Sequence, residues 1–281
     1  MLSKRVIVVT GPTASGKTSL AVKLAREFGC DVISADSRQV YAGIPIVTAQ
    51  PTEEEMGGVR HHLIGHLPLD AYYSAASFEE DALRLINEGF ETNDTVIVCG
   101  GSMLYIDALC HGIDDLPTIP IDFREELKTE YSEKGEDWIK ATLKLLDPDY
   151  YYSVDLKNLK RVFHAVEISL FTGKPYSSLL TGRKTERPFK IEKNVIELPR
   201  EELFRRINAR VDRMVDDGLI EEARNVYHLR GLNSLNTVGL KELFDWFDGK
   251  MQRDEALDRI KKNTRVFAKK QLTWLKKSEA R

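Results

Sequence analysis

One stretch, from Gly11 to Thr18, limits the folds open to this chain more than any other feature of the sequence. It reads Gly-Pro-Thr-Ala-Ser-Gly-Lys-Thr, follows the apolar β-branched run 6–9, and leads into an amphipathic helical pattern over 19–25. Its glycines permit conformations that turn successive N–H groups toward one point, and a helix N-terminus and Lys17 add positive charge. We therefore expect a strand, a loop and a helix that bind a diphosphate, with the Thr18 hydroxyl as a ligand for Mg²⁺. The predicted cradle consists of Gly11, Pro12, Thr13, Ala14, Ser15, Gly16, Lys17 and Thr18.

Composition sets the outer bounds of the interpretation. The chain has 281 residues, 42% hydrophobic and 30% charged, which suits one large or two modest globular domains. No run of 18 apolar residues predicts a membrane span, and the first strand begins too early for a signal peptide. The three cysteines have no C-x-x-C spacing, so we expect reduced thiols in a cytoplasmic protein. The net charge of −3 does not indicate a nucleic-acid partner, but residues 259–281 do, with nine Lys/Arg and one Glu.

Two further strands are predicted to end at the edge where the phosphate loop lies. Residues 31–35 lead into Asp36, and residues 95–99 lead into Gly100 and Gly101. In an open parallel sheet, residues just past the strands face the ligand crevice. Asp36 is either the cap of a turn or a general base. The strand 95–99 lacks the acidic residue of a Walker B strand, which favours a diphosphate leaving group over an NTP-hydrolysing machine.

Between these strands lie a histidine-rich loop and one helix. His61, His62 and His66 suggest a metal site, but their spacing does not place all three on one helical face and no acidic residue is interleaved. We interpret this region as loops over the active face. A helix is expected over 77–87, with Ser77 as its N-cap and Glu80 completing a capping box.

The middle of the chain reads as a helical insert. Helical patterns cover 122–134, 138–146 and 156–172, and no convincing strand precedes 194–198. We predict an α/β core formed by residues 1–116 and 190–281, and an all-helical insert formed by residues 117–189. The last helix of the insert carries Lys157, Lys160, Arg161 and His164, which form either a solvated basic face or an RNA contact.

The last third of the chain is helical. In the helix that follows Glu201, an apolar stripe runs beside Arg210, which has no acidic residue three or four positions away. Arg210 is therefore either solvated or available to an anionic ligand. A closing helix over 254–275 carries basic residues on its outer faces. Its expected core positions are Leu257, Ile260, Thr264, Phe267, Leu272 and Leu275.

Several motifs together resemble one family. They are the phosphate loop, Asp-Ser-Arg-Gln-Val-Tyr, Thr-Ala-Gln-Pro-Thr, His-His-Leu-Ile, Gly-Gly-Ser-Met-Leu-Tyr, Thr-Val-Gly and Ala-Lys-Lys-Gln-Leu-Thr-Trp. In this order, over essentially the whole chain, the sequence resembles the tRNA dimethylallyltransferases, also called tRNA isopentenyltransferases. The cysteine-based zinc module of eukaryotic relatives is absent, so the resemblance is to the bacterial type. Leu240 stands where the family commonly has Tyr, and Gly65 stands where Asp often follows His-His-Leu-Ile.

The resemblance implies a P-loop-type parallel sheet flanked by helices, with an all-helical insert that binds the tRNA anticodon stem-loop. It implies transfer of a dimethylallyl group from dimethylallyl diphosphate to N6 of the adenosine 3′ of the anticodon, by a Mg²⁺-using monomer. The implied catalytic residues are the base Asp36, the hydroxyl of Ser102 in place of the usual Thr, and the diphosphate ligands Lys17 and Arg210. The implied tRNA contacts are Asp36, Ser37, Arg38, Gln39, Ser102, Arg124, Lys160, Arg161, Val162, Phe163 and His164.

Three other functions remain open from the residues. A small-molecule kinase with this loop would use ATP, but it leaves the basic closing helix unexplained. A non-catalytic RNA-binding protein would explain the basic segments but not Lys17, Thr18 and Asp36 together. Prenyl transfer to free adenylate would need no helical insert.

Overall fold

The chain folds into two compact units. The computed structural model describes residues 4–114, 116–182 and 185–279. The first unit joins Met1–His111 to Glu186–Arg281, and the second is Gly112–Thr185. The insert therefore begins at 112, where the sequence had suggested 117, and ends at 185 instead of 189. Within the described residues, no helix has the length and apolar character needed to cross a membrane.

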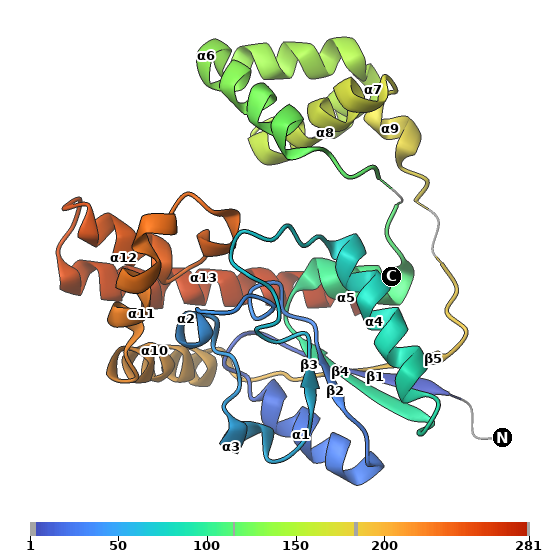
Figure 1. The fold of residues 1–281 in the computed structure, drawn as a ribbon, viewed down its shortest axis with the longest axis vertical. Coiled ribbons are helices and arrows are strands. Elements are labelled where there is room, and N and C mark those ends of the chain that lie inside the picture. Colours follow the sequence, from blue (N-terminus) through green and yellow to red (C-terminus); the bar gives the residue numbers. More distant parts are fainter. Residues whose placement is uncertain (1–3, 115, 183–184, 280–281) are drawn as a thin grey trace. The chain divides into compact units, whose positions relative to one another are not determined.

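A five-stranded sheet forms the centre of the first unit (Figure 1), with the order β3-β2-β4-β1-β5 and parallel pairing between all neighbours. The strands are β1 Arg5–Thr10, β2 Val32–Ser34, β3 His61–His62, β4 Thr95–Gly100 and β5 Lys190–Val195. The central strand β1 pairs with both β4 and β5, and its residues are almost fully buried because helices cover both faces. The carboxyl ends of β1, β2, β4 and β5 consequently form one edge, which the loops that follow them surround.

Alternate residues of the strands feed two cores. Val6, Val8 and Ile33 pack with residues of α4 (Ala75–Gly89) and α5 (Met103–His111), while Ile7 and Val9 pack with α1 (Lys17–Phe28). Figure 1 lets the reader follow α1 on one side of the sheet and α4 and α5 on the other. The other helices of this unit are α2 Pro45–Thr48, α3 Glu53–Met56, α10 Arg200–Asp216, α11 Leu219–Val226, α12 Leu240–Phe247 and α13 Arg253–Glu279, with 3₁₀ turns at Tyr227–Leu229 and Asn233–Leu235.

The second unit is helical and has its own core. It contains α6 Ile121–Leu146, α7 Pro148–Ser153, α8 Leu159–Thr172 and α9 Tyr176–Leu179. Gly135 interrupts α6 with φ of 80° and a non-helical ψ, which explains why the sequence reads as two helices there. Ile139, Leu143 and Val162 are completely buried in the core of this unit.

The structure corrects several expected boundaries. β5 begins at Lys190 and ends at Val195, before most of the expected strand 194–198. α4 starts after Ser74, whose side chain caps Ser77 N–H, so Ser77 is the third helical residue and not the cap. His61 and His62 form a short edge strand rather than loop. Phe267, expected in the core, is 41% exposed on α13, because the buried position beside it is taken by Ala268.

Candidate active site

The phosphate loop follows β1 and closes over the N-terminus of α1. A Cβ on Gly11 would lie 2.9 Å from the Ile196 carbonyl oxygen, and its φ of 155° is also unfavourable for other residues. Gly16 has φ of 92° and precedes the helix without providing a side-chain cap. The first N–H groups of α1 thus have no capping side chain within the described residues, and they converge on the loop as an anion site.

Two hydroxyls in the loop are also available. Ser15 Oγ is buried and has no hydrogen-bond partner in the described part of the chain. A buried polar atom without a partner is costly, and a bound oxyanion would satisfy it. Thr18 lies in the first turn of α1, where a hydroxyl combined with diphosphate and water oxygens fits the octahedral oxygen shell of Mg²⁺. The donor set therefore fits both a diphosphate and its Mg²⁺ ion.

Lys17 lies within the cradle. Its Nζ donates to the Pro12 carbonyl oxygen at 2.8 Å, which holds the ammonium under the loop. Burial lowers the pKa of Lys17 to about 8; Cys99 and Asp36 raise it, while Arg210 lowers it further. A diphosphate would reverse this shift by supplying the missing negative charge.

Arg210 extends from α10 to the same loop. Its Nη1 donates to Thr13 Oγ1 at 3.1 Å, and burial lowers its pKa while Asp36 acts in the opposite direction. On the same helix, Arg205 and Arg206 both pair with Glu202, whereas Arg210 has no ion pair within the ranges described. Arg210, which has no acidic residue three or four positions away in the sequence, therefore points toward the phosphate loop in the structure.

Asp36 follows β2 at the same edge. Its Oδ1 accepts hydrogen bonds from the backbone N–H groups of Arg38 at 2.9 Å and Gln39 at 3.3 Å. No hydrogen bond to Oδ2 is present among the described residues. The carboxylate thus caps a turn with one oxygen and keeps the other for a ligand, so the two interpretations of Asp36 are compatible.

Ser102 joins the ends of β4 and β2. Its Oγ accepts from Ser37 N–H at 2.8 Å and donates to Ser37 Oγ at 3.2 Å. The close approach depends on Gly100, where a Cβ would lie 2.1 Å from the Ala35 carbonyl oxygen. Ser102 therefore fixes the residue that follows Asp36 and so positions the carboxylate.

Two residues expected to contact tRNA have partners inside this unit. Arg38 Nη1 donates to the carbonyl oxygens of Asn233 at 2.8 Å and Ser234 at 3.1 Å. Gln39 Nε2 donates to the Ala49 carbonyl oxygen at 2.8 Å. Both side chains hold neighbouring loops in place, and their contact with RNA stays a prediction.

The insert residues divide into exposed and internal ones. Lys160 and Arg161 are exposed at the start of α8, as an RNA contact requires. Val162 has no exposed surface, because a helix directs successive residues to different faces, and its expected contact with tRNA stays a prediction. Phe163 is partly buried and makes an edge-to-face contact with Tyr131.

Arg124 and His164 share one buried acid. Arg124 Nε and Nη2 bind Glu167 at 2.6 and 3.0 Å, and His164 Nδ1 lies 3.5 Å from the same carboxylate. Although burial works in the opposite direction, the hydrogen bonds from His164 and Arg124 hold the pKa of Glu167 below its usual range. A bidentate pair of this kind fixes the fold of the insert.

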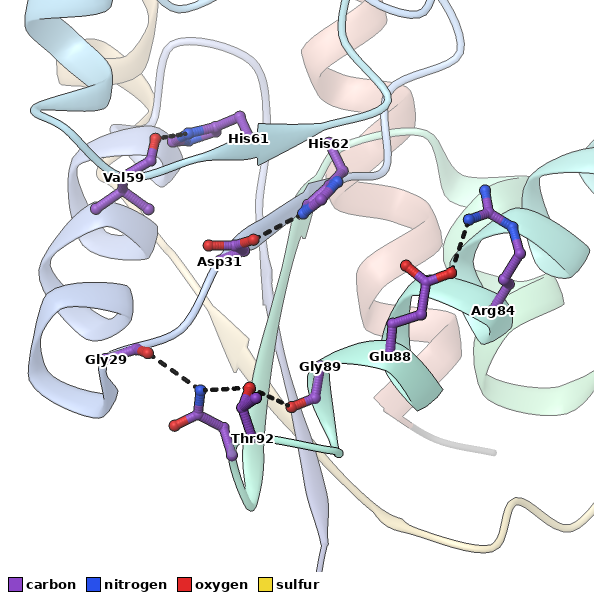
Figure 2. A network of polar contacts seen from close by, with 10 residues as sticks. Gly29, Asp31, Val59, His61, His62, Arg84, Glu88, Gly89 and Thr92 are labelled. Carbon is purple, nitrogen blue, oxygen red and sulfur yellow. Dashed lines mark hydrogen bonds and ion pairs between the residues drawn. The ribbon is translucent and has the colours of Figure 1, made fainter.

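His61 and His62 lie apart from this edge. Figure 2 shows His61 Nδ1 donating to the Val59 carbonyl oxygen and His62 Nε2 bonded to Asp31; the two contacts measure 3.0 and 2.9 Å. Asp31 precedes β2, so this network lies at the end of the sheet opposite to Asp36. Successive residues of a strand point to opposite faces. Within the residues the structure covers, no group of three or more side chains of metal-ligating type is found.

Two residues, Leu240 and Gly65, differ from the pattern of the family that the sequence resembles, and the structure shows how each one packs. Leu240 is completely buried at the first position of α12. Gly65 has φ of 55°, and a Cβ there would lie 3.4 Å from the Gln50 side chain. Both residues fit the packing around them.

Sequence reasoning missed Gln271. It lies on α13 but is bonded to both the phosphate loop and the loop after β4, through Thr13 N–H and the Gly101 carbonyl oxygen. The sequence feature that could have identified Gln271 is its place as a polar residue on the buried face of the closing helix.

Comparisons with known proteins agree with this geometry. A family model described as IPP transferase matches residues 39–278. A protein of Parabacteroides distasonis named tRNA dimethylallyltransferase 2 is 51% identical over 272 residues, covering 97% of this chain and 91% of its own. A protein of Bacteroides thetaiotaomicron named tRNA dimethylallyltransferase 1 is 49% identical over 274 residues, covering 98% and 89%.

Two solved structures are similar. A tRNA delta(2)-isopentenylpyrophosphate transferase from Staphylococcus epidermidis aligns with a TM-score of 0.68 and 34% identity, covering 97% of this chain and 90% of its own. A eukaryotic dimethylallyltransferase described as acting on tRNA aligns with a TM-score of 0.82 and 28% identity, covering 97% and 70%.

Proposed function

Because this chain belongs to the IPP transferase family, we propose that it prenylates tRNA. It transfers a dimethylallyl group from dimethylallyl diphosphate to N6 of the adenosine 3′-adjacent to the anticodon in certain tRNAs, and releases diphosphate. The observation that carries this proposal is the meeting of the phosphate loop, Arg210 and Asp36 at one edge of the sheet. All three come from one chain, so we expect a monomer to be active.

The leaving group is the main problem in this reaction. An adenine amine is a poor nucleophile, so the C–O bond to diphosphate must be largely broken in the transition state. Charge then develops on the diphosphate, where the loop N–H groups, Lys17 and Arg210 are already in place to stabilise it. Mg²⁺ held at Thr18 would supply further positive charge to the same oxygens.

The proton acceptor lies across from these donors. As the new bond forms, the N6 proton passes to Oδ2 of Asp36, the oxygen that the turn does not use. The adenine must leave its stack to reach this carboxylate. Lys160 and Arg161 on the insert are suited to bind phosphates of the anticodon stem-loop.

A direct assay distinguishes this function from its alternatives. The protein is incubated with labelled dimethylallyl diphosphate and Mg²⁺, first with bulk tRNA and then with AMP, and the nucleosides are analysed. We expect labelled N6-prenyl adenosine from tRNA and not from AMP. In a parallel incubation with ATP, robust ATP turnover with no prenyl product from the diphosphate would refute the proposal and favour a kinase. Labelled AMP would favour prenyl transfer to free adenylate.

A further inference from the structure

Gln271 links two loops with different roles in the proposed reaction, one that holds the leaving group and one that positions the base. Its side chain is 3% exposed on α13, the closing helix. Its Oε1 accepts from Thr13 N–H at 2.8 Å, and its Nε2 donates to the Gly101 carbonyl oxygen at 2.9 Å. One amide therefore joins the loop after β1 to the loop after β4.

The Thr13 arm leads to the leaving group. Thr13 Oγ1 accepts the hydrogen bond from Arg210 Nη1, so the position of the Thr13 backbone sets where the guanidinium lies. The preceding residue, Pro12, accepts the hydrogen bond from Lys17 Nζ. Both cations that face the diphosphate are thus oriented by the short segment that Gln271 holds.

The Gly101 arm leads to the base. Gly101 precedes Ser102, whose Oγ accepts from the N–H of Ser37, the residue after Asp36. Movement of the Gly101 carbonyl would shift Ser102 and, with it, the turn that orients the Asp36 carboxylate. The two arms together hold the leaving-group donors and the proton acceptor in a fixed relation.

The chemistry of this position calls for an amide. A carbonyl and an N–H must be satisfied at the same buried place, so the side chain has to be acceptor and donor at once. A Cβ on residue 101 would lie 2.5 Å from Nε2, so the glycine is needed for this approach. A leucine or methionine of similar size would leave both backbone groups unsatisfied.

We propose that Gln271 is a positioning residue that sets the diphosphate donors and the Asp36 base at their working separation. This inference rests on the proposed function. Because a displacement of about 1 Å can cost about 10²-fold in rate, Gln271→Met should lower the single-turnover rate of prenyl transfer by about that factor. It should also raise the KM for dimethylallyl diphosphate, and the affinity for tRNA should not change.

The matched control is Leu275→Ala, which removes a buried apolar side chain one turn further along α13 and removes no hydrogen bond to either loop. Rates are compared at equal folded fraction, measured by thermal unfolding. Leu275→Ala should lower the unfolding temperature and leave the single-turnover rate near that of the wild type. If Gln271→Met, corrected in this way, stays within about twofold of the wild-type rate, Gln271 is only a structural residue and the proposal fails.

A double-mutant cycle tests the route of the effect. If Gln271 acts through Thr13 and Arg210, then Gln271→Met should cost much less in an Arg210→Ala background than in the wild type. If the two substitutions lower the rate by factors that simply multiply, that route is overturned.

Titration with inorganic diphosphate keeps the test of positioning independent of the prenyl-transfer assignment. If the wild type prenylates no tRNA, the proposed function fails. Even then, a weaker affinity of Gln271→Met than of the wild type for inorganic diphosphate would support the positioning role. An unchanged affinity would refute that role.

Discussion

Replacing Lys17 by methionine should make the substrate-free protein more stable while removing most of its activity. Burial lowers the pKa of Lys17 from 10.5 to about 8, and this difference corresponds to roughly 3 kcal/mol against the charged form. The side chain keeps some contact with solvent, which reduces this cost. Lys17→Met also loses the hydrogen bond to the Pro12 carbonyl oxygen, which takes about 1 kcal/mol from the gain in stability. A net gain in stability of about 1 kcal/mol remains.

The dependence on pH follows from the direction of the shift. Because the folded-state pKa of Lys17 is below its unfolded value, the unfolded chain binds more protons between pH of about 8 and 10.5. The free energy of unfolding of the wild type should therefore rise with pH in this window, relative to Lys17→Met. Binding of a diphosphate needs the ammonium, so kcat/KM for dimethylallyl diphosphate should fall as the pH rises through about 8.

The assays are thermal unfolding with and without diphosphate, and steady-state kinetics across this pH range. Lys23→Met is the matched control, because Lys23 is an exposed lysine on the same helix. Inorganic diphosphate should raise the unfolding temperature of the wild type and of Lys23→Met much more than that of Lys17→Met. A lower unfolding temperature for Lys17→Met than for the wild type, together with a flat pH profile, would refute the reasoning.

Three other variants test the remaining parts of the site. Asp36→Asn should lower kcat by about 10²–10⁴ while the turn persists, because the amide oxygen still accepts from Arg38 N–H; a wild-type single-turnover rate would leave Asp36 only as a cap. Arg210→Ala should lower kcat by about 10²–10³ and raise the KM for dimethylallyl diphosphate, both measured by steady-state kinetics. Replacing Lys160 and Arg161 by Ala should reduce the slope of log K for tRNA against log salt concentration by roughly 0.7–0.9 per lost phosphate contact. If the variant and the wild type bind tRNA equally well at every salt concentration, these residues have no role in RNA binding.

The sequence predicts well the elements whose chemistry is local. The phosphate loop, the strands before it and before Asp36, and the long helices all follow from spacing and periodicity within a short window. β3 could not be found, because a two-residue edge strand exists only through its pairing with Val32 and Ile33. The start of α4 at Ser74 was missed because two serines three residues apart both suit an N-cap, and tertiary packing of Ala75 decides between them.

Side-chain orientation is the second feature that a sequence pattern leaves open. Val162 follows two basic residues in sequence, yet the helix turns its side chain into the core of the insert, since neighbouring residues lie about 100° apart around the axis. Phe267 lies beside Ala268, and the smaller residue faces the core of the first unit. Gln271 shows the limit most clearly, because its partners Thr13 and Gly101 are distant in sequence and only the fold brings the three together.

The absence of an acid at the end of β4 acquires a physical meaning in this arrangement. In a Walker B strand, a carboxylate at this place would hold a metal ion against a nucleotide. Here the strand ends at Gly100 and Gly101 follows it, and the space that side chains would occupy at these two positions is filled by Ala35 and by Gln271. The β4 end thus serves to fix geometry, and the acid of the site stands on the neighbouring strand end as Asp36. An acid on that side can accept a proton from a nucleophile, and its charge offsets part of the burial effect that lowers the pKa values of Lys17 and Arg210.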